Sequence, residues 1–229
     1  GAGWSLQGDE PMPSASLIKF PIMLELYLQA AEGKVRLADL VTLRDRDKVP
    51  GSGILTYHFS EGATLSLKDL CRLMIVYSDN TATNLVLDRI GLASTNQRMQ
   101  AWGLSETRLN AKVYRGDTTS LDPERTRRFG LGSTTGNETI RLLEKVHKGE
   151  VVSARFCQEI LDHMKKCDDP LKLKRNLPRG TVVAHKTGSV DDAKTDAGII
   201  YTPTGPVAVC VLTAQNEDRR WEDDNAAHV

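Results

Sequence analysis

Apolar residues recur at helical spacing through the first two-thirds of the chain, and this pattern predicts a largely helical region. The run from Leu17 to Ala31 predicts a long apolar helix that ends near Gly33. Ser66-Leu67-Lys68-Asp69 has the pattern of a capping box, so we expect a helix from there to about residue 77. The same reasoning predicts further helices at 81–90, 94–102, 137–148 and 153–166.

The last third of the chain changes to short apolar runs typical of strands, at 181–186, 197–202 and 207–214. The turn Thr204-Gly205-Pro206 joins the last two, which predicts that they pair antiparallel. We also expect a short strand at 4–6 and a long loop over residues 103–133. A strand, then many helices, then a meander of strands indicates an α+β fold with an antiparallel sheet packed beside helices.

Bulk composition argues against several classes of function. The 229 residues include 30 basic and 30 acidic ones, and no basic stripe indicates a nucleic-acid partner. The sequence has no apolar run of about 18 residues, so we expect no membrane span. The four cysteines and five histidines do not have metal-ligand spacing, so we expect neither a metal nor a cofactor.

Three short motifs carry the candidate chemistry: Ser16-Leu17-Ile18-Lys19, Ser78-Asp79-Asn80 and Lys186-Thr187-Gly188. The first motif alone is common. The two tripeptides together are expected by chance in about one chain in a thousand. Their joint presence, in this order, therefore favours a shared function.

The first two motifs suit a serine enzyme that forms a covalent acyl intermediate. If Ser16 opens the first helix, Lys19 lies one turn further on the same face. A buried lysine beside another cation loses proton affinity, so Lys19 could act as the base on a Ser16 nucleophile. Ser78 would then pass a proton to the leaving nitrogen, and the Asn80 amide would bind the substrate and fix Lys19.

The third motif would bind the substrate. Lys186 and Gly188 share one face of a predicted strand, with Thr187 on the other. Lys186 would hold a substrate carboxylate, and the N–H of Ser189 is a candidate oxyanion donor beside it. These roles require the strand to run past the start of the first helix.

At these residues the chain resembles the class A β-lactamase fold of the penicillin-recognising serine enzymes. Further residues that match the family pattern are Asn84, Leu85, Gly103-Leu104, Thr107-Arg108-Leu109 and Ser189. The resemblance implies a five-stranded antiparallel sheet, an all-helical subdomain and an active site in the cleft between them. It also implies covalent acylation at Ser16, with Lys19, Ser78 and Lys186 as catalytic residues and Asn80, Thr187, Gly188 and Ser189 binding the substrate.

The resemblance carries further expectations about organisation and partners. We expect one discontinuous subdomain of about 1–33 and 178–229, and a helical subdomain of about 34–177. The expected partner is a small-molecule β-lactam or a peptidoglycan stem peptide. We also expect the protein to be a monomer that is exported to the periplasm or cell envelope. Members of the family have elements before Gly1 and a longer helix than 219–229 offers, so we expect a natural chain that is longer at both ends.

One element of the family pattern is in doubt, the Glu that activates the deacylating water. Glu106-Thr107-Arg108-Leu109-Asn110 matches the Glu-x-x-Leu-Asn pattern, so Glu106 is a candidate. In the family, however, a Thr-Arg-Leu stretch usually precedes the Glu by several residues. That alignment keeps the family's distances to Ser78 and Lys186 and puts the Glu position near Val113, where no carboxylate occurs.

Without that Glu the acyl-enzyme should persist, which favours a penicillin-binding D,D-peptidase. Three alternatives stay open: a true class A β-lactamase that uses Glu106, an inactive sensor of β-lactam or peptidoglycan, and a promiscuous esterase. Asp117 and Glu124 are weaker candidates for the base. The nucleophile alone does not choose among these functions.

Overall fold

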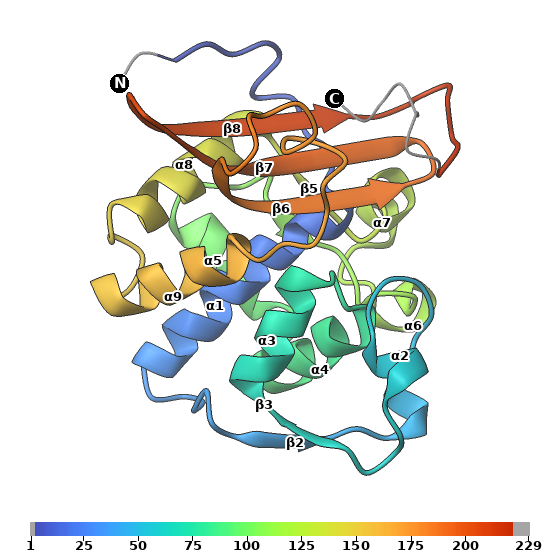
Figure 1. Cartoon of the computed structure of the whole chain (residues 1–229). Coiled ribbons are helices and arrows are strands. Elements are labelled where there is room, and N and C mark those ends of the chain that lie inside the picture. The colour runs from blue at the N-terminus through green and yellow to red at the C-terminus, as the bar shows by residue number, and fades with distance from the viewer. Residues whose placement is uncertain (1–2, 222–229) are drawn as a thin grey trace.

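The computed structural model describes residues 3–221 and has an antiparallel sheet on one side of a cluster of helices (Figure 1). The sheet consists of β6 (Val182–Val190), β7 (Ala193–Thr202) and β8 (Gly205–Thr213), in that order. Both pairs are antiparallel, as the turn at 204–206 predicts for β7 and β8. Within the described residues β6 pairs with β7 alone, so it is an edge strand of this sheet.

β6 and β7 reach further than the sequence predicts, through the third motif. Lys186 pairs with Ala197 and Thr187 with Asp196, and the pairing continues to Val190. The polar residues at 194–196 hide this part of β7 from a search for apolar runs. The resemblance implied five strands, whereas the described part of the chain forms three in this sheet.

Helices make up most of the rest, and the long ones form near their predicted bounds. They are the 3₁₀ helices η1 (Ala15–Ile18) and η2 (Asp45–Asp47), and α1 (Lys19–Ala31), α2 (Leu55–His58), α3 (Leu67–Val76), α4 (Asn80–Ile90), α5 (Ser94–Ala101), α6 (Gly116–Thr119), α7 (Pro123–Phe129), α8 (Gly136–His147) and α9 (Ala154–Met164). The predicted cap is confirmed, since Ser66 Oγ accepts the N–H of Asp69 at the start of α3.

α1 lies at the centre of the core and contacts α3, α4, α5 and α9. η1, which leads into α1, contacts β6 and β7, while α8 packs on β7 and β8 and α9 on β6 (Figure 1). The apolar faces of these two helices therefore join the sheet to the helical cluster. The division into subdomains at about 34 and 178 stays a prediction, and it assigns both of these sheet-contacting helices to the helical part.

Two small sheets complete the fold. β1 (Met12–Pro13), β5 (Gly132–Thr134) and β4 (Arg108–Leu109) form one, and β2 (Leu40–Thr42) and β3 (Thr64–Ser66) form the other. β4, α6 and α7 lie in the segment 103–133 and β5 begins in it, so the prediction of a long loop there is wrong in detail.

The strand predicted at 4–6 is also wrong. That segment has no partner strand among the described residues, and Trp4 and Leu6 are exposed. Of the helix expected over 219–229, residues 219–221 have no regular structure and the remainder lies outside the described residues.

Candidate active site

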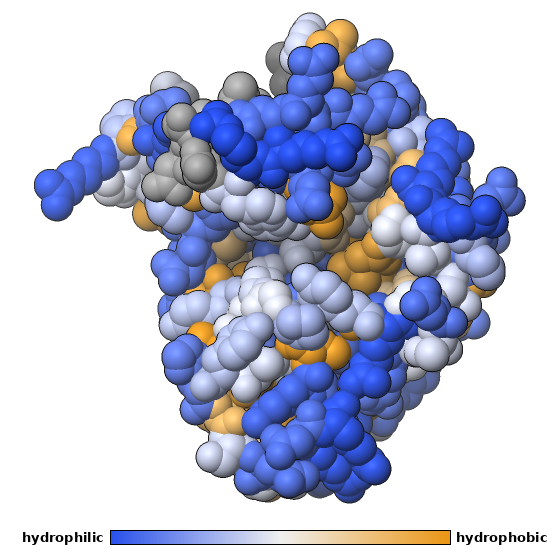
Figure 2. Space-filling view, turned by 90° about the vertical axis from the view of Figure 1, so that its right-hand side faces the viewer, coloured by the Kyte–Doolittle hydropathy of each residue, from blue (hydrophilic) through white to orange (hydrophobic). Residues whose placement is uncertain are grey.

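A cavity of about 760 Å³ lies along the free edge of β6 and opens to the surface. Figure 2 shows that face hollowed between an upper part, which carries the sheet, and a lower part of helices and loops. Residues of all three motifs line this cavity, namely Ser16, Ser78, Asn80, Thr187, Gly188 and Ser189. Folding therefore brings together segments more than a hundred residues apart in the sequence.

Ser16 lies in η1, one turn before α1 begins at Lys19, and is half-buried in the cavity wall. β6 passes close beside it, since a Cβ at Gly188 would come within 2.7 Å of the Ser16 nitrogen. The glycine in this motif is thus required by packing, and β6 runs past the start of the first helix as the motifs require. Within the described residues the Ser16 hydroxyl makes no hydrogen bond, including to Lys19.

The Ser78 hydroxyl lies between two lysine amines. Lys19 Nζ donates to Ser78 O at 2.7 Å, Asn80 Oδ1 at 2.8 Å and Ser78 Oγ at 3.2 Å. Lys186 Nζ donates to the same Oγ at 3.1 Å and to Thr187 O at 2.6 Å. Ser78 has a φ of +52°, a left-handed conformation that costs energy for a residue with a side chain and occurs often at functional sites.

Both lysines are fully buried, and this changes their proton affinity. Burial, and then the charge of Lys186, lowers the pKa of Lys19 well below its usual value, while Asp79 opposes the shift. Burial also lowers the pKa of Lys186. Because a buried charge loses its hydration and the two amines repel each other, Lys19 is more often the neutral amine, the form that can act as a base.

Asp79 holds the second motif in place. Its Oδ1 accepts the Ala82 N–H and caps α4, while Oδ2 accepts the N–H groups of Ile54 and Leu55 at 2.7 and 2.8 Å. Gly53 packs so closely that a Cβ there would fall 2.3 Å from the Asp79 carboxyl carbon. The loop before α2 is thereby fixed against the start of α4. Both segments line the cavity, the loop with Gly51 and Ser52 and the helix with Asn80.

Residues 111–114 form one side of the cavity, and we call them the 111–114 wall. Asn84 of α4 holds this wall through both ends of its amide: Nδ2 donates to Val113 O at 3.0 Å and Oδ1 accepts the Val113 N–H at 2.9 Å. Tyr114 follows with a φ of +54°. The backbone of Val113 is therefore fixed at the cavity, and its side chain is apolar.

The sequence candidates for a deacylation base lie elsewhere. Glu106 does not line the cavity, and its Oε2 pairs with an Arg125 guanidinium nitrogen at 3.1 Å. Asp117 and Glu124 are exposed and do not line the cavity either.

Sequence reasoning missed Asp169, the one carboxylate among the described residues that line the cavity. Burial opposes its ionisation, but the charge of Lys172 and hydrogen bonds from Leu171 N–H, Lys172 and Thr187 lower its pKa to about 2. Asp169 follows the end of α9 in a segment without regular structure, so no pattern in the sequence links it to Thr187.

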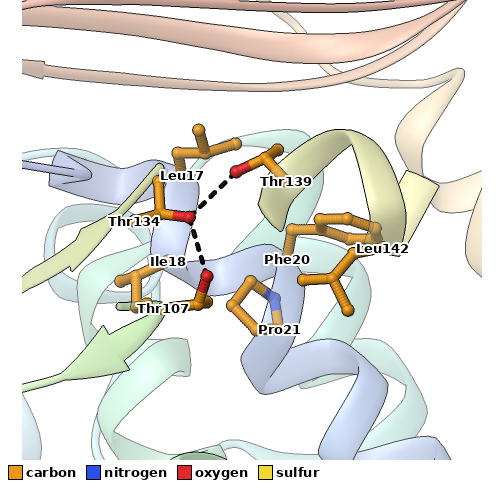
Figure 3. A pocket seen from close by; sticks show the side chains of 8 residues that line it. All are labelled: Leu17, Ile18, Phe20, Pro21, Thr107, Thr134, Thr139 and Leu142. Carbon is orange, nitrogen blue, oxygen red and sulfur yellow. Dashed lines mark hydrogen bonds between the residues drawn. The ribbon is translucent and has the colours of Figure 1, made fainter. Parts of the chain in front are cut away.

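A second, small cavity of about 10 Å³ lies beside η1 and the start of α1 (Figure 3). Three threonine hydroxyls form a chain beside it, with Thr134 Oγ1 at 2.9 Å from both Thr107 and Thr139. Thr107 also donates to Glu138 Oε2 at 2.6 Å. These hydrogen bonds connect the residue before β4 with β5 and α8. The small cavity holds one water molecule at most.

Two kinds of feature, a membrane-spanning helix and a metal-binding cluster, are absent from the residues that the structure describes. These residues contain no helix long and apolar enough to cross a membrane. They also contain no cluster of His, Cys, Asp or Glu side chains that could bind a metal ion.

Comparison with known proteins agrees with this geometry. The model of the Beta-lactamase enzyme family matches residues 1–229. The chain belongs to the β-lactamase enzyme family. It is accordingly a serine hydrolase of the β-lactamase type with an α+β fold, as the three motifs predicted.

Relatives support the same assignment. A crystal structure of a β-lactamase from Sphaerobacter thermophilus is 31% identical, covers 94% of this chain and 79% of that one, and has a TM-score of 0.83. An acyl-enzyme complex of a PBP-A variant with penicillin G is 32% identical, covers 95% and 78%, and has a TM-score of 0.81. β-Lactamase AER-1 of Aeromonas hydrophila is 28% identical over 224 residues, 95% of this chain and 70% of that protein.

Proposed function

We propose that this member of the family is acylated at Ser16 by β-lactams and by peptides ending in D-Ala-D-Ala, and releases the acyl group slowly, as a penicillin-binding D,D-peptidase does. The observation that carries the proposal is the 111–114 wall. Its Val113 backbone is fixed by Asn84 at the position predicted for the deacylation base, and no carboxylate is present there.

Acylation would proceed with Lys19 as the base. Lys19 takes the proton of Ser16 as Oγ attacks the substrate carbonyl carbon, and the N–H groups of Ser16 and Ser189 bind the oxyanion. Ser78 then gives its proton to the leaving nitrogen and regains one from Lys19. The lowered pKa of Lys19 and the place of Ser78 Oγ between the two amines support this sequence. Lys186 stays a cation and holds the substrate carboxylate.

Deacylation would be slow because the carboxylates near the cavity are unsuited to activate water. Asp169 has a pKa of about 2, which makes it a weak base, and it is bound to Lys172 at 3.1 Å. Glu106 is paired with Arg125 outside the cavity. The PBP-A variant was crystallised as an acyl-enzyme with penicillin G, so a neighbour of this fold holds such an intermediate.

Stopped-flow kinetics with a chromogenic cephalosporin test the proposal. We expect a burst of about one equivalent of product per chain, followed by a much slower steady phase. Sustained fast turnover after the burst would favour the rival, a true class A β-lactamase. Absence of a burst would favour a sensor that does not react, and a burst with simple esters alone would favour an esterase.

The proposal extends to partner and place. A D,D-peptidase of this kind acts as a monomer on peptidoglycan stem peptides in the periplasm or cell envelope, as the resemblance implies. Release of D-Ala from a synthetic stem peptide, measured beside the cephalosporin burst, tests the substrate. Fractionation of cells that express the natural chain tests the location.

A further inference from the structure

The two faces of β6 carry different groups near the cavity. Lys186 and Gly188 point to the side of Ser78 and Ser16. His185 and Thr187 point to the opposite side, because side chains alternate along a strand. Asp196 pairs with Thr187 in the register and therefore shares that side with His185. A polar group thus lies directly behind the strand that carries the third motif.

His185 and Asp196 form a buried ion pair there. The imidazole is 0% and the carboxylate residue 2% exposed. Nδ1 of His185 lies 3.0 Å from both carboxylate oxygens. Burial opposes protonation of the ring, but Asp196, which is hydrogen-bonded to Nδ1, and then Cys167 raise the pKa of His185 to about 9. This shift favours the protonated ring at neutral pH, although its buried Nε2 has no hydrogen-bond partner among the described residues.

Asp196 also fixes the segment that follows α9. Its Oδ2 accepts the Leu173 N–H at 3.1 Å. The same segment carries Asp169 in the cavity wall and Cys167, whose pKa His185 lowers. Asp196 of β7 thus connects β6, through His185, with the segment after α9, through Leu173. β6 needs this support because it has a hydrogen-bonded neighbour strand on one side alone among the described residues.

The ion pair also contributes to the charge around Lys186. The titratable groups that act on Lys186 from the elements packed around it are Lys19, Cys167, Asp169, Lys172 and Asp196. Burial lowers the pKa of Lys186 and Lys172 lowers it further, whereas Cys167, Asp196 and Asp169 raise it. Asp196 is therefore one of the groups that keep Lys186 a cation.

We propose that His185 and Asp196 are positioning residues for acylation: their buried ion pair holds the β6 edge against the cavity, and Asp196 places a carboxylate behind Lys186. This inference rests on the proposed function, in which Lys186 acts as a cation. Neither residue touches the substrate. Their effect is exerted through the place and the protonation of Lys186.

The test measures the second-order rate constant of Ser16 acylation by a fluorescent penicillin from pH 5 to pH 10. Asp196→Asn removes a negative charge near Lys186, so the alkaline fall in rate should move to lower pH by about one unit. His185→Gln removes a positive charge and should move that fall to higher pH. Glu25→Gln is the control, because it breaks another buried carboxylate pair, with Arg98, on the far part of α1.

Opposite shifts in the two variants, with none in the control, would support the inference. Equal alkaline limbs in all four proteins would overturn it and leave the pair a purely structural contact. If wild-type protein is not labelled at any pH, the proposed function fails instead. Should either variant not fold, NMR titration of His185 in wild-type protein decides: a pKa near 9 supports a charged pair, and one at or below 6.5 excludes it.

Discussion

The cavity that Ser16 lines has two sides with different chemistry. On the Ser78 side, two buried lysines share one hydroxyl, and each amine is held by further backbone or amide oxygens. On the side of the 111–114 wall, Asn84 holds the backbone through two hydrogen bonds, yet none of the four residues of the wall is a carboxylate. Both sides are held by hydrogen bonds, whereas the buried lysines that act on a serine hydroxyl lie on one side alone among the described residues.

This difference separates the two halves of an acyl-transfer reaction. Forming the acyl-enzyme needs a base for Ser16 and an acid for the leaving nitrogen, and the Ser78 side offers both. Releasing it needs a base for water. In the proposed function, a carboxylate at the 111–114 wall would therefore decide whether the acyl-enzyme formed with a β-lactam persists or is hydrolysed.

The largest expected effect is on the Ser78 side, from Lys19→Met. Loss of the base should lower the rate of Ser16 acylation about a thousandfold, as for removal of a general base elsewhere. Stopped-flow labelling with a fluorescent penicillin measures it. Lys68→Met, which removes a partly exposed lysine paired with Glu159, is the control and should leave the rate unchanged. A loss of less than tenfold in Lys19→Met would contradict a role as base.

The next effect is on the 111–114 wall, from Val113→Glu. A carboxylate there should activate water and raise the rate of acyl release about a hundredfold, with acylation changed little. Release is followed by intact-protein mass spectrometry after excess β-lactam is removed. Val113→Gln has the same shape without a base, so an equal acceleration in both variants would show that the position does not supply a base.

A smaller effect concerns stability and pH. A group whose pKa is higher in the folded than in the unfolded state stabilises the fold below its unfolded pKa. That contribution is lost as the pH rises through the folded value. For His185, with a folded pKa of about 9 against 6.5, the loss should fall between pH 6.5 and 9 and amount to about 3 kcal/mol at most.

Urea unfolding of wild-type protein and of His185→Gln across this range isolates that contribution, because other groups titrate in both. The free-energy difference between the two proteins should shrink as the pH rises. A difference that stays constant from pH 6 to pH 10 would contradict a charged His185.

The smallest effect is expected for Glu106→Gln and Asp169→Asn. Acyl release should change less than twofold in either variant, because neither carboxylate acts on water in this account. Loss of the partly exposed Glu106–Arg125 pair should cost about 1 kcal/mol or less. A release rate that falls tenfold or more in one of these variants would identify that residue as the base.

The residues on the Ser78 side of the cavity could be predicted from the sequence better than the contacts of the 111–114 wall. Ser16, Lys19, Ser78 and Lys186 lie in short motifs, and the helix that begins at Lys19 and the strand that holds Lys186 lie in apolar runs. The alignment of Thr107-Arg108-Leu109 put Val113 at the position of the base, and the structure places Val113 in the cavity wall. Its fixation by Asn84 could not be read from the sequence, since it joins α4 to a loop.

Contacts across the sheet were also hidden. Asp196 lies in a polar stretch that does not look like a strand in the sequence. Its pairing with His185 can therefore be seen only once the register of β6 and β7 is known. Asp169 lies in a segment without periodicity, and its nearness to Thr187 depends on how that segment folds over the sheet. Such contacts depend on tertiary structure, whereas motifs and caps are local.

The most direct test of the account is the fate of the Ser16 acyl group. Wild-type protein is labelled with a fluorescent penicillin, chased with excess unlabelled penicillin, and the labelled peptide is identified by mass spectrometry over time. The account predicts one label per chain, on Ser16, that persists for many minutes and is absent in Ser16→Ala. A label released within seconds, or attached to a different residue, would contradict it.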